Sequence, residues 1–177
     1  MGRGARTAFA LVLAIAVVAG AGSAQARVDG ARTLTARNSL EADVLVQINL
    51  FRRSRGLAPL RLSGALRRAA DSHSSAMATR GFFAHESADG TAFWQRVARF
   101  YPRLNGGWSV GENLLWSSPD VDGAGALRMW LNSPPHRKIL LTPRWREVGL
   151  SAVHAASAPG VYRGLEVTVI TADFGVR

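Results

Sequence analysis

The sequence predicts an α+β fold in which helices cover an antiparallel sheet. Apolar residues recur at helical spacing through much of residues 38–132, whereas residues 148–155 and 161–172 are rich in valine, as strands are. Ala158-Pro159-Gly160 joins these two segments and is typical of a hairpin turn. A run of helices followed by a run of strands favours this class over an alternating parallel sheet.

Four helices are predicted before the hairpin. The first begins at Asn38 or Ser39, with Glu41 as a capping-box partner, and Gly56 ends it. The second follows Ser63 as N-cap and stops before Gly81, the third covers residues 91–100, and the fourth runs from Ser118-Pro119 to Asn132. A short strand is predicted at residues 114–116. The apolar stripes of the first two helices are Leu40, Val44, Ile48, Phe51 and Leu66, Ala70, His73, Met77.

The first residues have the pattern of an export signal. Two arginines precede an apolar run from Ala8 to Ala19, and Ala24-Gln25-Ala26 resembles a signal cleavage site. We expect cleavage after Ala26; an uncleaved anchor is the alternative. Residues 27–38 are predicted to be a flexible leader, and residues 39–177 one domain.

Charge and cysteine content limit the partners. The full chain has a formal net charge of +10, and loss of Arg3 and Arg6 with the signal leaves +8. The arginines within residues 52–55 and 67–68 are interpreted as parts of solvated helix faces. If this charge has a partner, we expect anionic wall polymer or phospholipid headgroups, and we expect no nucleic-acid binding. The chain has no cysteine, which excludes disulfides and thiolate metal sites.

Three side chains of the kind that bind metals lie beside turn-forming residues: His85, Glu112 and His136. Turns place side chains at the ends of elements, so these three can converge in one cleft. Two imidazoles and a carboxylate suit Zn²⁺ and leave a fourth position open for water or substrate. The alternative is structural: Glu112 braces a turn, His136 bonds to the Pro134-Pro135 turn, and His85 is a surface residue. His73, on an apolar stripe, is interpreted as a hydrogen-bonded core histidine.

The order of several short segments resembles the CAP superfamily of cysteine-rich secretory, antigen 5 and pathogenesis-related-1 proteins, and most closely its short bacterial branch. The segments are residues 69–73 with Met77, Phe82-Phe83-Ala84-His85, Gly111-Glu112-Asn113, residues 130–137 and Glu147-Val148-Gly149. The resemblance implies a three-layer α-β-α sandwich. It departs from the animal and plant members, which are rich in disulfides.

The resemblance also implies a cavity lined by two histidines and two acidic residues. His85, Glu112 and His136 match three of these positions, whereas Ser133 stands where the second acid is expected. We expect Asn113, Trp130 and Ser133 to line this cavity. A competing G-x-S-x-G match at residues 107–111, with Asp120 or Asp122 and His136 following, suggests a serine hydrolase, but the predicted loop before Ser109 and strand after it argue against a nucleophile elbow.

The sequence therefore predicts a monomeric protein that is secreted or held in the cell envelope, with no membrane span after signal cleavage. We expect it to bind a divalent cation such as Zn²⁺, a lipid or a wall component in the cavity around His85, Glu112 and His136. The alternative is a metal-dependent hydrolase of peptide or peptidoglycan in which Glu112 is a ligand or the base.

Overall fold

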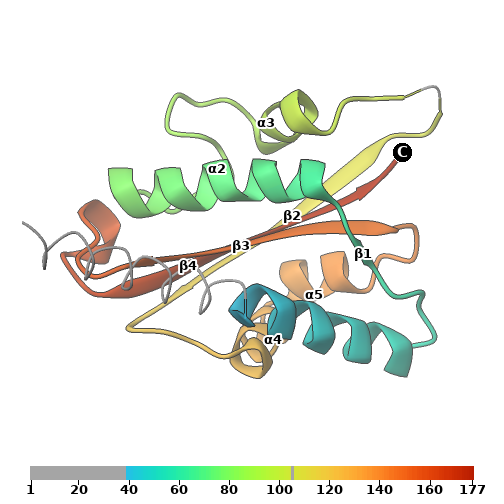
Figure 1. The fold of residues 1–177 in the computed structure, drawn as a ribbon, viewed down its shortest axis with the longest axis horizontal. Coiled ribbons are helices and arrows are strands. Elements are labelled where there is room, and N and C mark those ends of the chain that lie inside the picture. The colour runs from blue at the N-terminus through green and yellow to red at the C-terminus, as the bar shows by residue number, and fades with distance from the viewer. Residues whose placement is uncertain (1–38, 105) are drawn as a thin grey trace, which may run out of the picture. The chain divides into compact units, whose positions relative to one another are not determined.

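The computed structural model describes residues 39–104 and 106–177, and these form one α-β-α sandwich (Figure 1). The predicted signal, its cleavage site and the leader lie outside the described residues. The central sheet has four strands in the order β1-β3-β4-β2: Arg61–Leu62 (β1), Glu147–Ala155 (β3), Val167–Val176 (β4) and Ser109–Ser117 (β2). The predicted α+β class is confirmed. β3, β4 and β2 are antiparallel, and only the two-residue β1, which was not predicted, pairs in parallel.

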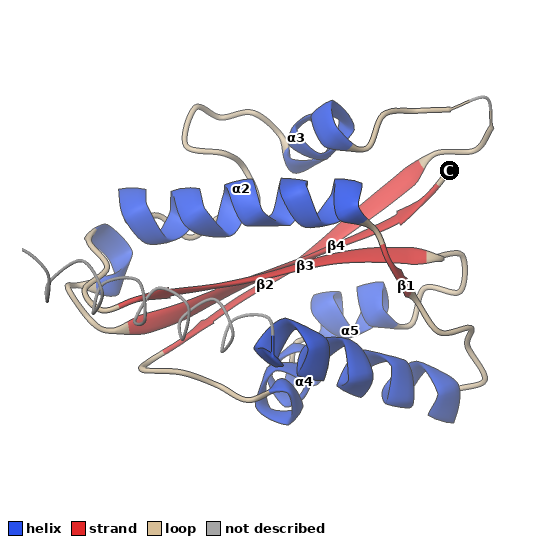
Figure 2. Ribbon diagram, in the orientation of Figure 1, coloured by secondary structure: helices blue, strands red, loops and turns tan. Residues whose placement is uncertain are grey.

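Helices cover both faces of the sheet (Figure 2). One face carries α2 (Gly64–Arg80) and α3 (Phe93–Phe100); the other carries the helix of residues 39–54, α4 (Gly123–Asn132) and α5 (Pro134–Leu140). Gly149 on β3 permits the close approach of α2, because a Cβ there would overlap the backbone of Leu66 and Arg67. None of the helices within the described ranges is long and apolar enough to cross a membrane.

Several predicted boundaries were wrong for identifiable reasons. α4 begins at Gly123, not near Pro119, because the Asp122 side chain caps the Gly125 amide and Asp43 binds the Gly123 amide. Pro134-Pro135 is not a turn but the first turn of α5, where proline lacks only an amide that would be unpaired anyway. β4 begins at Val167, since residues 160–162 form a 3₁₀ turn.

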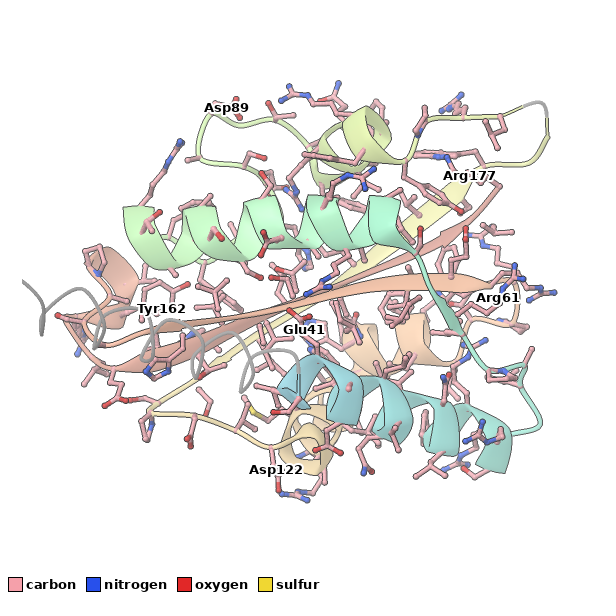
Figure 3. All side chains as sticks on the ribbon, in the orientation of Figure 1. Glu41, Arg61, Asp89, Asp122, Tyr162 and Arg177 are labelled. Carbon is pink, nitrogen blue, oxygen red and sulfur yellow. The ribbon has the colours of Figure 1, made fainter. Side chains whose placement is uncertain are left out.

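Two polar side chains tie the first helix to the rest of the domain. Glu41, which lies between this helix and the sheet (Figure 3), accepts a hydrogen bond from the Ala152 amide and pairs with Arg67 at 3.0 Å. The Asn38 partner of the predicted capping box lies outside the described residues. Arg52 is fully buried and donates to the carbonyls of Leu140 and Thr142. Its assignment to a solvated face was therefore wrong.

Candidate functional site

The candidate site lies along β2, one of the two edge strands of the sheet. Successive residues of a strand point to opposite faces. Glu112 therefore faces the layer of α2 and α3, whereas Asn113 faces α5, to whose His136 carbonyl its side-chain amide donates at 3.1 Å. His85, on the segment between α2 and α3, reaches the same edge, where its ring centroid lies 6.5 Å from that of His136. Residues from both helical layers thus meet beside one strand.

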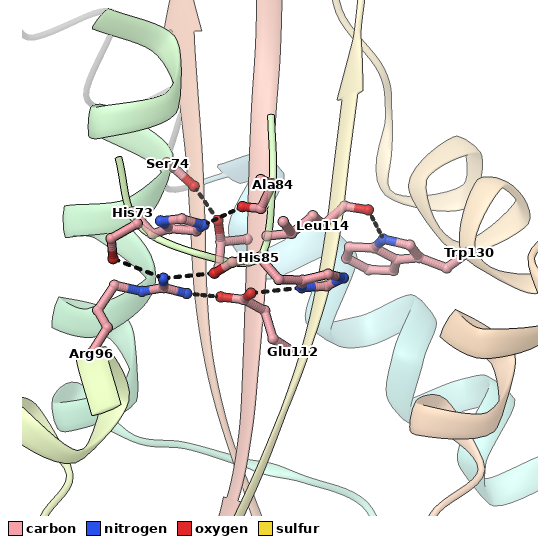
Figure 4. Close-up of polar contacts among 10 residues, drawn as sticks. His73, Ser74, Ala84, His85, Arg96, Glu112, Leu114 and Trp130 are labelled. Carbon is pink, nitrogen blue, oxygen red and sulfur yellow. Dashed lines mark hydrogen bonds and ion pairs between the residues drawn. The ribbon is translucent and has the colours of Figure 1, made fainter. Parts of the chain in front are cut away.

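Glu112 is the central group of this site and is held from two sides (Figure 4). The Oε1 atom is 2.8 Å from Nδ1 of His85, and Oε2 accepts a hydrogen bond from the Arg96 guanidinium. Arg96 also donates to the His85 carbonyl at 2.9 Å and to the Ser87 hydroxyl at 3.3 Å. Arg96 was not predicted. It fixes both Glu112 and the backbone that carries His85.

The surroundings of the two histidines shift their pKa values in opposite directions. The hydrogen bond to Glu112 raises the pKa of His85, and burial lowers the pKa of His136, with a further lowering from His85 itself. Near neutral pH, His85 is therefore the more readily protonated of the two. A pair with separated pKa values can recognise an anion with one ring while the other ring keeps a free lone pair.

Asp173 on β4 lies directly beside Glu112 in the ladder and was also missed by the sequence analysis. It is fully buried, and neither carboxyl oxygen has a hydrogen-bond donor in reach among the described residues. Burial, followed by repulsion from Glu112, raises the pKa of Asp173 well above its ordinary range. These surroundings therefore favour the neutral form of Asp173 beside Glu112.

An open groove of about 580 Å³ runs over these residues. His85, Glu112, Asn113 and His136 form its polar part, and the wall includes Phe93, Ile139 and Trp145. Two cations, Lys138 and Arg144, lie at its border, where Arg144 stacks over the Trp145 ring at 5.0 Å from its centroid. The groove has the size typical of small-molecule sites, with a largely apolar wall and a few polar groups.

Two residues expected at the cavity lie elsewhere. Trp130 is completely buried in the core, and its indole donates to the Leu114 carbonyl at 3.0 Å on the opposite side of β2 from Arg96 (Figure 4). Ser133 joins α4 to α5 as the cap of both helices and is not among the groove residues. His73 is buried, with Nε2 at 2.9 Å from the Ala84 carbonyl, as expected of a core histidine.

Of the three predicted metal ligands, only the imidazoles of His85 and His136 are placed to bind a metal. Among the described residues, no three His, Cys, Asp or Glu side chains are arranged to hold one ion. Glu112 is already engaged by Arg96 and by Nδ1 of His85. A carboxylate in that position normally orients a metal-binding imidazole through the nitrogen that does not bind the metal. In this arrangement Glu112 supports His85, and His85 and His136 are the residues that would contact a cation.

The G-x-S-x-G motif does not form a nucleophile elbow. Ser109 is the first residue of β2 and pairs with Val176 on β4. A nucleophile elbow requires a sharp turn from a strand into a helix, but here the motif opens a strand.

The fold agrees with the family that matches this sequence. The family model of the CAP proteins, described as the cysteine-rich secretory protein family, matches residues 45–171, well over half of the chain. The chain therefore belongs to the CAP family. Its groove, with His85, Glu112 and His136, is built on that family's sandwich fold.

Three known proteins illustrate the similarity. The uncharacterized membrane protein YlbC of Bacillus subtilis (strain 168) is 30% identical over 110 residues, which are 62% of this chain and 30% of YlbC. An extracellular SCP-domain protein from Bacillus anthracis str. Ames has a TM-score of 0.65 at 24% identity, covering 83% of this chain and 43% of that one. An outer surface protein from Borrelia burgdorferi has a TM-score of 0.58 at 20% identity, covering 75% of this chain and 89% of that one. This chain thus spans less than a third of YlbC, and the two structures support the fold alone.

Proposed function

We propose that this protein is a binding module of the extracellular space or cell envelope, and that its groove takes a small amphipathic molecule with an anionic group. The observation that carries the proposal is the composition of the groove: Phe93, Ile139 and Trp145 on an apolar wall, beside His85, His136, Lys138 and Arg144. An envelope lipid, or a wall fragment with an apolar part, has this combination of properties.

The location is part of the same proposal. The amino-terminal pattern predicts export. Two structural neighbours are described as an extracellular protein and an outer surface protein. A groove that opens toward solvent on such a protein can take ligands from its surroundings without a large conformational change.

A divalent cation is the second candidate ligand. The contact between His85 and Glu112 favours it, since it leaves Nε2 of His85 for a metal and brings a second imidazole within reach. Zn²⁺ titration by calorimetry should give binding that weakens on acidification, because the imidazoles must be neutral to act as ligands. Replacing His85 and His136 together by alanine should abolish it. Retained Zn²⁺ affinity in that folded variant would exclude the groove as the metal site.

Binding is preferred over hydrolysis for a reason in the geometry. A metal-dependent hydrolase would use Glu112 as the base toward a water. Here one oxygen of Glu112 contacts His85 and the other accepts from Arg96, so the carboxylate is occupied by structural partners. Turnover of peptide or peptidoglycan by the Zn²⁺-loaded protein would reverse this preference.

A fluorescent fatty acid, such as a dansylated undecanoate, tests the main proposal. Saturable fluorescence enhancement is expected with the wild-type protein. Ile139→Asp removes apolar wall and Lys138→Glu reverses one cation, and each should weaken binding by roughly tenfold or more, the range for loss of a buried apolar or charged contact.

Matched controls lie on the neighbouring helix α4. Met129 and Arg128 are both exposed and outside the groove, so Met129→Asp and Arg128→Glu make the same chemical changes on another surface. These controls should bind the probe as the wild type does. An equal loss in both pairs would show that the probe responds to overall charge or hydrophobicity, and the groove proposal would fail.

A further inference from the structure

A second pocket, of about 200 Å³, lies between α2 and α3 on the face of the sheet that carries these helices. It shares no residue with the groove described above. Ser72, Ala76 and Arg80 line it from successive turns of α2, Arg96 and Arg99 from α3, and residues 87–89 from the intervening segment, where Asp89 is seen in Figure 3. The groove and this pocket are therefore separate hollows, one on each side of Arg96.

The charges around this second pocket are unbalanced. Three arginines line it, against the single carboxylate of Asp89. Asp89 is directed to its own loop, where Oδ1 accepts a hydrogen bond from the Thr91 amide at 2.9 Å. Within the described ranges, neither Arg80 nor Arg99 forms an ion pair. Burial lowers the pKa of His73, the remaining ionisable residue, so at neutral pH it adds no charge.

Arg96, which also lines this pocket, has a buried side-chain nitrogen with no hydrogen-bond partner among the described residues. Its two terminal nitrogens are bound to Glu112, to the His85 carbonyl and to Ser87, but its Nε is buried and has no hydrogen-bond acceptor among the described residues. A buried donor on a cation is costly to leave unpaired. An acceptor supplied from outside the chain would relieve this cost.

The size of the pocket sets the class of ligand. A liquid water occupies about 30 Å³, so this volume admits a handful of waters or one small polyatomic anion, but no lipid chain. Arginine is well suited to oxyanions, since its planar guanidinium donates two parallel hydrogen bonds to phosphate or carboxylate oxygens. The hydroxyls of Ser72 and Ser87 add two short donors on the same walls.

We propose that the pocket between α2 and α3 is an oxyanion site that binds a phosphate group through Arg80 and Arg99, with Ser72 and Ser87 as further donors. It is distinct from the groove, and it holds whether or not the groove takes an amphipathic ligand. The phosphate is either a free ion or a phosphoryl group on a larger envelope molecule.

Calorimetric titration of the purified full-length chain with inorganic phosphate, at constant ionic strength, tests this site. Binding should be saturable in the wild type, and Arg80→Gln and Arg99→Gln should each weaken it by roughly tenfold or more, because each removes a charge-assisted hydrogen bond. Arg128→Gln on α4, outside both the groove and this pocket, should leave the affinity unchanged. The absence of phosphate binding by the wild type, or an equal loss in this control, would overturn the proposal.

The ordinary explanation of Arg80 and Arg99 predicts a different result. Both lie in the last turn of a helix, where a cation complements the helix dipole. If that is their only role, the glutamine variants will lose thermal stability and keep their phosphate affinity, which would overturn the site. Ala76→Glu is an additional test that spares the arginines: a carboxylate placed on the pocket wall should compete with phosphate and abolish its binding.

A second titration separates the two sources of phosphate. A short glycerol phosphate oligomer that binds more tightly than inorganic phosphate would identify the ligand as part of an envelope polymer. Tighter binding of inorganic phosphate would identify a free ion. Either order, combined with loss of binding in Arg99→Gln, supports the site.

Discussion

Glu112 and Asp173 occupy paired positions on neighbouring strands, yet their surroundings are opposite. Both are buried carboxyl groups. Glu112 has a guanidinium on one oxygen and an imidazole on the other, whereas both oxygens of Asp173 lack a donor among the described residues. Burial alone does not decide which acid carries charge, because a neighbouring cation can offset the cost of desolvation.

The difference arises from the sheet order. Glu112 is on the edge strand β2, which α3 and the segment carrying His85 can reach. Asp173 is on the inner strand β4, between Glu112 and Gly149, and α2 packs closely over Gly149. In the described part of the chain, no cation pairs with Asp173 directly. Glu112 thus has hydrogen-bonding and charged partners at the groove, whereas Asp173 is buried beside it with no hydrogen-bond partner among the described residues.

The largest effect on stability is expected from replacing Arg96, the cation that binds both the Glu112 carboxylate and the His85 carbonyl. Arg96→Met keeps much of the side-chain volume but leaves Glu112 buried without its guanidinium. Loss of one partner of a buried ion pair typically costs about 3–5 kcal/mol. Urea unfolding followed by circular dichroism should show a loss of this order. Arg128→Gln, on the exposed surface of α4, should change stability by less than about 0.5 kcal/mol. A loss below about 1 kcal/mol in Arg96→Met would mean that Glu112 does not depend on Arg96.

Replacing Asp173 is expected to have a smaller effect of opposite sign, a gain in the free energy of unfolding. Its folded pKa is raised, so above the unfolded value of about 3.9 the unfolded chain releases a proton that the folded chain retains, and stability falls as pH rises. Asp173→Asn has the shape of the neutral acid and no titration. It should therefore stabilise the protein at pH 7 by an amount on the order of 1 kcal/mol.

The pH dependence of the stability gained in Asp173→Asn tests whether the gain comes from the titration of Asp173. Urea unfolding of both proteins should show that the advantage of Asp173→Asn shrinks as pH is lowered toward about 4, where the unfolded aspartate also keeps its proton. If the variant is less stable than the wild type at every pH, Asp173 is ionised in the fold and the contrast with Glu112 is wrong.

The fold was predictable from periodicity because its helices bury clear apolar stripes and β4 is rich in Val and Ile and almost wholly buried. α5 was missed because Pro134-Pro135 was interpreted as a turn, although proline is favoured in the first turn of a helix. The start of α4 depends on Asp43, 80 positions before Gly123, and no local pattern reveals such a contact.

The site was predictable only in part. His85, Glu112 and His136 were identified by their segments, but their mutual geometry depends on β2 being an edge strand, which follows from topology. The two missed ionisable residues had a signal in the sequence: Arg96 interrupts the apolar face made by Phe93, Val97 and Phe100, and Asp173 is the only ionisable residue between Val167 and Val176. An ionisable side chain in apolar surroundings needs a partner or a shift to its neutral form, and here both side chains lie beside Glu112. Trp130 was misplaced because a helix residue beside a motif can equally well face the core.

The smallest expected effect concerns the histidines that Glu112 influences, and NMR titration of the imidazole signals can measure it. His85 should titrate above the ordinary histidine pKa of about 6.5 and His136 below it. The His85 contact therefore stabilises the fold below about pH 6.5, and this contribution is lost as pH rises through the folded pKa. The stability contribution of His136 has the opposite pH dependence: it is present at higher pH and lost on acidification, because acidification opposes the burial of His136.

Glu112→Gln removes the carboxylate while keeping a side-chain oxygen, and it should lower the pKa of His85 while changing that of His136 little. An unchanged His85 titration in Glu112→Gln would show that the exposed half of the His85 ring, rather than Glu112, sets its protonation.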